Sequence, residues 1–244
     1  MQIDSEALGA SLKRLRKAPH EPDVVRALQR VVSSVDRLFG YDGAGIMLID
    51  QEEQLRYVAA GDEAGRSLEE AQARAEQGPC YDTYVVGHPV TTKDVRSDAR
   101  WPQLAEVLDE RVRAVAGVPI LLGGSPVGTL NVYQSEPAEW DESDIVALRA
   151  YAGLTGELVA AALASQEHSA TVAQLQYALD YRVVIERAIG FLMATHGEDA
   201  VAAFNRLRPA GPRQPPARRR PRRRGPERGR RLNLRTCRPS PTRS

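Results

Sequence analysis

The chain has 244 residues, of which 42% are hydrophobic and two are cysteine, and its formal net charge is +1. This length and composition suit one large or two small folded domains, and they exclude a disulfide framework and a zinc site built on cysteines. The sequence has neither an apolar secretory segment at its start nor a run of about 20 apolar residues, so we expect a cytoplasmic protein without a membrane span.

The first part of the chain predicts a helix followed by a hairpin. Residues 21–39 repeat apolar side chains at three- and four-residue steps, which predicts an amphipathic helix that ends at Gly40. Two short apolar runs follow at 43–50 and 54–61. Because a polar stretch separates them, we expect two paired β-strands.

The middle of the chain predicts a helical insertion and a second hairpin. In chain order we expect a helix at 67–75, a short segment at 81–86 after the break at Gly78-Pro79, a brief strand within 88–94, a helix at 98–111 and paired strands at 115–122 and 126–134. Strands at both ends with helices between and outside them predict an α+β fold, in which helices flank an antiparallel sheet.

A long helix is expected to begin near Asp141. Apolar residues continue at heptad-like intervals and no proline interrupts residues 138–208, so we expect a connecting, coiled-coil-like helix at 166–181. A shorter helix is predicted at 182–197, with Gly197 as its C-terminal cap. One more helix is predicted at 198–208, where apolar residues again recur at helical steps.

The charge changes sign after this last helix. Residues 208–244 contain 14 arginines, eight prolines and one acidic residue, a charge of +13, which leaves −12 for residues 1–207. A segment of this composition cannot build a core, so we expect residues 209–244 to be disordered. Since an acidic body does not attract nucleic acid, any affinity for RNA must come from a local basic surface or from the tail.

Three segments carry a family resemblance: QGPCYDTYVVGHPV at 77–90, DVRSDARWPQ at 94–103 and GVPILLGGSPVGTLNVY at 117–133. In this order they resemble the GAF family of small-molecule sensing domains, in the version found in actinobacterial regulators. The resemblance implies a sensor domain over residues 21–165 that holds a small effector between its sheet and its helices.

Five residues are candidates for the effector pocket: Cys80, Tyr81, Tyr84, Trp101 and Tyr133. Cys80 would act as a redox sensor if a helix N-terminus stabilised its thiolate, and the alternative is a packed small side chain. Trp101 either contacts the ligand or packs the loop over the cavity.

The segment LQYALDYRVVIERAIGFLMATHGEDAVAAFNRLR at 175–208 resembles the ANTAR family of RNA-binding antiterminator domains. The resemblance implies an RNA-binding domain at 182–208, and it implies that a third helix should follow. Here the Arg- and Pro-rich tail follows instead, so the ANTAR bundle is expected to be incomplete. We interpret the tail as an off-frame translation of a GC-rich gene, and the alternative is a genuine basic arm for nucleic acid.

The candidates for RNA contact are four arginines: Arg182, Arg187, Arg206 and Arg208. Contacts to phosphate would dominate such binding, although each arginine could equally balance a nearby acid such as Glu186 or Glu198. In the same segment, Phe191 and Phe204 are expected to be core residues rather than platforms for base stacking.

Together these features predict a regulator that senses a signal through one domain and promotes antitermination by binding nascent RNA hairpins through the other. The connecting helix predicts a homodimer. We identify no nucleophile elbow, phosphate-binding glycine loop or spaced metal ligands, so we expect no enzyme activity, metal or cofactor. The alternative function is a sensor or dimerisation module with a defective output, which would act by protein contact alone.

Overall fold

The computed structural model describes residues 3–17, 23–50, 54–164 and 184–207. The predicted connecting helix at 166–181 and the predicted disorder of 209–244 lie outside these described residues.

The centre of the fold is a five-stranded antiparallel sheet with the order β2-β1-β5-β4-β3. Its strands are β1 (Gly43–Ile49), β2 (Leu55–Ala60), β3 (Val90–Thr92), β4 (Ala114–Leu122) and β5 (Ser125–Gln134). The two predicted hairpins, β1–β2 and β4–β5, are present. They meet because β1 also pairs with β5, so strands far apart in the sequence form the middle of the sheet.

The strands alternate cleanly between two buried faces. On β5, Leu130 and Val132 lie in one apolar cluster, whereas Tyr133 lies in another. On β1, Ile46 belongs to the first cluster and Met47 to the second. Since successive side chains of a strand point to opposite faces, the sheet is covered on both sides and each side has its own core.

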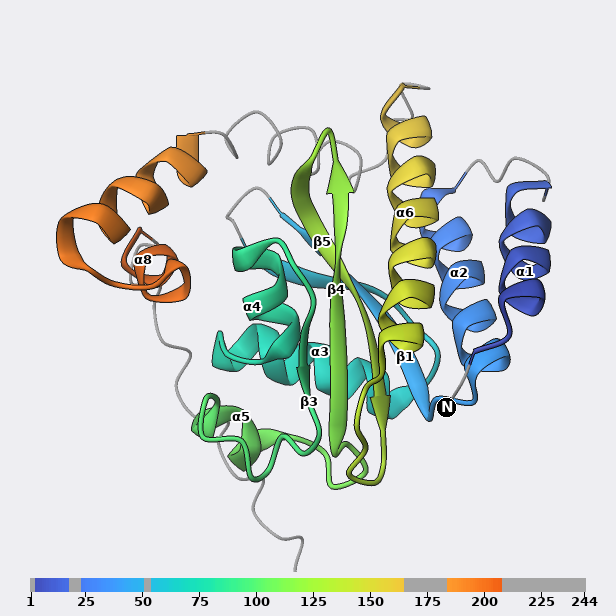
Figure 1. Ribbon diagram of the computed structural model, residues 1–244, viewed down its shortest axis with the longest axis horizontal. Coiled ribbons are helices and arrows are strands. Elements are labelled where there is room, and N and C mark those ends of the chain that lie inside the picture. The colour runs from blue at the N-terminus through green and yellow to red at the C-terminus, as the bar shows by residue number, and fades with distance from the viewer. Residues whose placement is uncertain (1–2, 18–22, 51–53, 165–183, 208–244) are drawn as a thin grey trace, which may run out of the picture. The chain divides into compact units, whose positions relative to one another are not determined.

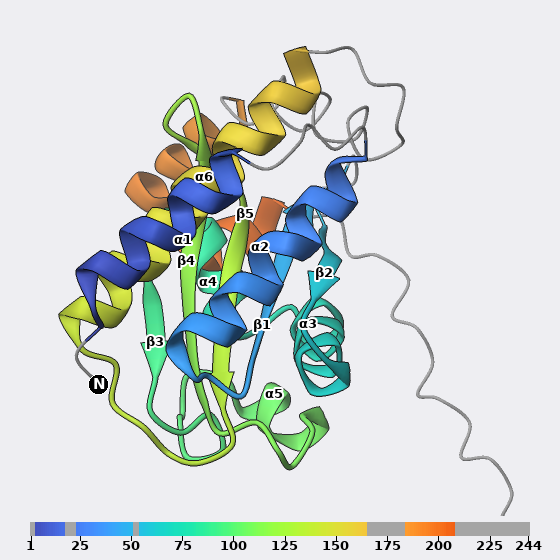
Figure 2. The ribbon, with the colours of Figure 1, turned by 90° about the vertical axis from the view of Figure 1, so that its right-hand side faces the viewer.

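The first face is covered by α2 (Val24–Phe39) and α6 (Glu142–Ala164), and α1 (Ser5–Lys17) packs on the outside of these two helices, as Figures 1 and 2 show. The helix α2 matches the prediction for 21–39. Asp23 caps its first turn by accepting a hydrogen bond from the Val25 amide, and Gly40 ends it in the left-handed conformation, with φ of 64°. The sequence analysis did not predict α1.

Among the described residues, α6 is the one helix with the length and apolar composition to cross a membrane. Half of its apolar window is buried inside the protein, where residues such as Leu148 and Tyr151 pack in the first core cluster. The apolar residues of α6 therefore cover the sheet.

The second face is covered by α3 (Glu63–Ala75), α4 (Pro79–Val86) and α5 (Pro102–Val107). Two predicted boundaries were wrong. The helix α3 begins before residue 67, because the Asp62 side chain accepts from the Gly65 amide and caps it there. The helix α5 is much shorter than 98–111, because Asp98 and Asp109 bond the amides two residues ahead and so favour turns over helix.

Two further helices follow the undescribed segment. Residues 184–196 are helical and Gly197 is left-handed, with φ of 64°, as predicted for a C-terminal cap. The second helix is α8 (Ala200–Leu207). Phe204 is buried as expected, but the expectation for Phe191 was wrong, since it is 67% exposed. Phe191 lies on the side of its helix that packs against nothing in the described part of the chain.

Candidate functional site

The middle of the second sheet face is a row of three residues, Gly45, Asn131 and Gly117, paired across β1, β5 and β4. The two glycines leave room for the helices above them. A Cβ atom on Gly45 would lie 2.5 Å from Glu69 Oε1, and one on Gly117 would lie 2.8 Å from Thr83 Oγ1. The absence of side chains at these positions therefore brings polar groups of α3 and α4 down to the strands.

Glu69 lies on α3 and is completely buried, with 0% of its surface exposed. Asn131 Nδ2 donates a hydrogen bond of 2.8 Å to Glu69 Oε1, whereas Oε2 has no partner among the described residues. Burial raises the pKa of this carboxyl to about 8, and the bond from Asn131 opposes the shift. Glu69 is thus a proton-binding group buried in the core of this face.

Two further polar atoms on this face have no partner in the described part of the chain, Asn131 Oδ1 and Thr129 Oγ1. Thr129 and Asn131 are two positions apart, and so on the same side of β5, and they are 0% and 1% exposed. An unpaired buried polar atom costs about 1–3 kcal/mol. Together with Glu69 Oε2, these two atoms form a polar cluster of three unpaired atoms on this face. A bound polar molecule would gain hydrogen bonds there.

Cys80 adjoins this cluster from α4. Gln72 Nε2 donates to Cys80 Sγ over 2.6 Å, and the Cys80 amide donates to Gln72 Oε1 over 2.9 Å. Burial raises the pKa of the Cys80 thiol well above its ordinary value, and the nearby Glu69 carboxyl adds to the shift. The thiol is therefore held protonated, which favours the packed side chain over the redox sensor of the two alternatives.

The other four predicted pocket residues lie in the same apolar cluster as Cys80, on the second face of the sheet. Tyr133 donates from its hydroxyl to Asp62 Oδ2 over 2.7 Å, and burial raises its pKa. Trp101 donates from Nε1 to Asp82 Oδ2 over 3.0 Å, and the Arg100 guanidinium lies 4.1 Å from its ring centre. Tyr81 and Tyr84 are buried on α4. The structure thus gathers all five, and two of them support neighbouring loops and caps.

Sequence reasoning missed the most polar members of the site, Glu69, Thr129 and Asn131. One signal for the strand residues was available, because Thr129, Asn131 and Tyr133 alternate with apolar residues. Glu69 carried no such signal. It follows Leu68 in a helix rich in glutamate, and only the packing of α3 against β1 shows that it points inward.

Two surface hollows in the described part of the chain lie elsewhere. One of about 190 Å³ is lined by residues of α2, β1 and β2, including Asp50 and Arg56, which are joined by an ion pair of 2.6 Å. The other, of about 450 Å³, lies between α1 and α2 and is lined by Arg14, Arg30 and Arg37 among others. Neither includes a predicted pocket residue.

Of the four arginines predicted to meet RNA, the structure describes Arg187 and Arg206, and both are exposed. Arg206 makes a two-pronged ion pair with Glu198, at 2.8 Å from its terminal nitrogen, and this raises the pKa of Arg206 and lowers that of Glu198. Arg182 and Arg208 lie outside the described residues.

Comparisons with known proteins identify two domain families along the chain. The profile of the GAF domain matches residues 21–160, and that of the ANTAR domain matches residues 173–210. No functionally curated protein matches the chain significantly.

Similar solved structures include free methionine-R-sulfoxide reductase from Neisseria meningitidis with its substrate, at 18% identity and a TM-score of 0.53, over 68% of this chain and 96% of that one. The GAF domain of a phosphoenolpyruvate-protein phosphotransferase from Coxiella burnetii has 18% identity and a TM-score of 0.54, over 66% and 94%. Its counterpart from Acinetobacter has 16% identity and a TM-score of 0.52, over the same shares. At such low identity these likenesses show the fold alone.

Proposed function

Because the chain belongs to the GAF domain family and carries an ANTAR domain at residues 173–210, we propose that it is a regulator whose GAF domain receives a signal and whose ANTAR helices bind RNA to promote antitermination. The succession of these two domains is the observation that carries the proposal. The pairing is that of a regulatory protein, and the proposal includes the absence of enzyme activity, a cytoplasmic location and action as a homodimer.

The signal in this proposal is a small polar effector bound at the second face of the sheet. The unpartnered oxygens of Glu69, Thr129 and Asn131 support it, since they provide hydrogen-bonding groups within an apolar enclosure. Of the five predicted pocket residues, Cys80 borders these oxygens from α4, Trp101 and Tyr133 lie in the same apolar cluster, and Tyr81 and Tyr84 meet Phe204 of α8. Cys80, Trp101 and Tyr133 supply shape and apolar contact, while the three unpartnered residues select the polar groups of the effector.

The RNA-binding part of the proposal rests on Arg187 and Arg206 in the described helices, with Arg182 and Arg208 flanking them in the sequence. Arginine side chains on short helices can meet the phosphates of a folded RNA, whose backbone supplies most of the binding energy. Arg206 is paired with Glu198, the alternative role considered for these arginines, so a phosphate would have to compete with this exposed ion pair.

The experiment that tests RNA binding is an electrophoretic mobility shift with a structured RNA hairpin and a single-stranded RNA of the same composition. We expect Arg187→Ala and Arg206→Ala each to weaken binding to the hairpin and to reduce the slope of log affinity against log salt by about 1. The matched control is Arg149→Ala on α6, which removes the same charge from the GAF domain.

A chain that ends after residue 208 separates the helices from the tail. If binding disappears with the tail, is indifferent to RNA structure and is unaffected by the arginine variants, then the affinity is nonspecific charge attraction and the proposal is wrong.

Homodimerisation is supported by apolar residues of the helix at 184–196 that remain uncovered in the described part of the chain. Val184 is 61% exposed and Phe191 is 67% exposed. A second copy of the chain would remove them from water. Sedimentation equilibrium of the full chain measures this directly, and a monomer at all concentrations would contradict it.

A further inference from the structure

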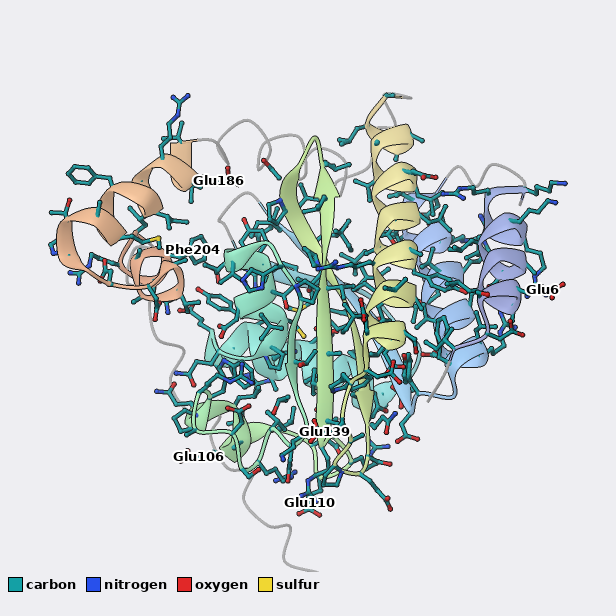
Figure 3. All side chains as sticks on the ribbon, in the orientation of Figure 1. Glu6, Glu106, Glu110, Glu139, Glu186 and Phe204 are labelled. Atoms are coloured by element: carbon teal, nitrogen blue, oxygen red, sulfur yellow. The ribbon has the colours of Figure 1, made fainter. Side chains whose placement is uncertain are left out.

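The helix α8 rests on α4 of the GAF domain through one aromatic side chain. Phe204 is 1% exposed, and its ring meets those of Tyr81 and Tyr84 at 5.9 Å between centroids in both cases, each in an edge-to-face arrangement. Figure 3 shows Phe204 on the side of α8 that faces α4. Beside it, the Tyr81 hydroxyl donates a hydrogen bond of 2.6 Å to Asn205 Oδ1.

The apolar faces of both C-terminal helices share this contact. Ile189 and Ala203 are 6% and 0% exposed, and they belong with Phe204 to the same core cluster as Tyr84 and Trp101. The core of the GAF domain is thus continuous with that of the C-terminal helices.

The helix α8 needs such a contact in order to stay folded. It has eight residues, whereas isolated helices shorter than about 12–15 residues are marginal in water. The burial of Phe204 depends on its contacts with Tyr81 and Tyr84 of α4.

The helix α4 has a different role on its opposite side. Thr83 donates from its hydroxyl to the Gly117 carbonyl over 3.2 Å, and Cys80 is held by Gln72 next to Glu69. One side of α4 therefore touches the polar cluster, and the side with Tyr81 and Tyr84 receives Phe204. Because α4 has only eight residues, a displacement of the side that touches the polar cluster also displaces the side that carries Tyr81 and Tyr84.

We propose that the Tyr81–Tyr84 side of α4 is a docking surface for the chain's own C-terminal helices, with Phe204 as the anchor, and that these helices are ordered only while docked. The docking makes the folding of the output helices depend on the sensor domain. Its consequence for RNA binding rests on the proposed function, but the docking itself does not.

Hydrogen exchange on the full-length protein tests the proposal, with Phe204→Ala compared against Leu207→Ala. Both variants shorten an apolar side chain of α8, but Phe204 is buried against α4 and Leu207 is 37% exposed. We expect Phe204→Ala to speed amide exchange throughout 184–207 by roughly a hundredfold or more, while Leu207→Ala changes it far less.

The amides of α2 report whether the variant keeps its GAF fold, because α2 lies on the far face of the sheet. Tyr81→Phe is a milder variant from the sensor side. It removes only the hydroxyl that bonds Asn205, and we expect exchange in 184–207 to rise by roughly threefold to tenfold.

Two results would overturn the proposal: residues 184–207 exchange freely in the wild type, or Phe204→Ala and Leu207→Ala change their exchange equally. If exchange follows the expectation but the hairpin RNA is not bound by any variant, docking stands and the proposed function fails. If the RNA is bound equally by the wild type and Phe204→Ala, the helices bind without docking and the coupling is wrong.

Discussion

The two faces of one sheet differ in what they bury. The face under α1, α2 and α6 buries mainly aliphatic and aromatic side chains, among them Leu28, Leu130 and Leu148, and its buried polar side chains Ser11, Asp144 and Thr155 are hydrogen-bonded. The opposite face buries Glu69 and Asn131 among its apolar residues and leaves polar atoms of both without partners in the described part of the chain. Because the same strands form both faces, the difference lies in their alternate residues and in the helices above them. It separates a face that stabilises the fold from the binding face, at which we propose that the effector binds.

The largest effect is expected on the stabilising face. Leu148→Ala in α6 removes a fully buried side chain from the apolar cluster of this face. We expect it to lower the free energy of unfolding by about 2–5 kcal/mol, measured by urea denaturation. Leu121→Ala is the matched control, since Leu121 is 43% exposed at the end of β4 and should change stability little. Equal losses in the two variants would mean that this face does not carry the stability.

A pH-dependent effect is expected on the binding face. The pKa of Glu69 is raised to about 8 by burial, so the folded state holds its proton more tightly than the unfolded state does. Stability from this group is greatest below its unfolded pKa of about 4.3 and falls as the pH rises towards 8. Between pH 5 and pH 8 the wild type should lose about 3 kcal/mol that Glu69→Gln does not lose, because each pKa unit corresponds to about 1.4 kcal/mol.

The control for this measurement is Glu70→Gln, which changes the neighbouring carboxyl on the outer side of α3, where its side chain is 54% exposed. It should keep the pH dependence of the wild type. If Glu69→Gln and the wild type respond alike to pH in urea denaturation, Glu69 is not the buried proton-binding group, and the contrast between the two faces is weaker than the structure indicates.

The smallest effect concerns Tyr133, which lies on the second face beside the N-terminal cap of α3. Tyr133→Phe removes a hydroxyl that donates to Asp62, the residue that caps this helix. We expect a loss of about 1 kcal/mol in thermal or urea unfolding. Tyr57→Phe serves as the control because Tyr57 is 37% exposed. A loss much larger than this would mean that the ring of Tyr133 is disturbed as well as its bond to Asp62.

Local patterns in the sequence predicted much of the secondary structure. The helix before Gly40 and both hairpins are where periodicity placed them, because each depends on residues close together in the chain. The predicted length of the helix at 98–111 was wrong, since Asp98 and Asp109 form local turns that the apolar pattern does not reveal. For the same reason Phe191 and Phe204 looked alike in the sequence, and only one of them is covered.

The sequence by itself determined the α+β class, the GAF and ANTAR segments and the five aromatic and cysteine residues of the predicted pocket, since motifs and periodicity are properties of neighbouring residues. The tertiary structure alone decided that β1 pairs with β5, that Gly45 and Gly117 flank Asn131 and that Glu69 is buried above them. It also decided that Phe204 lies on α4. These contacts join residues far apart in the chain, and their energies depend on burial and hydrogen bonding that exist only once the layers have packed.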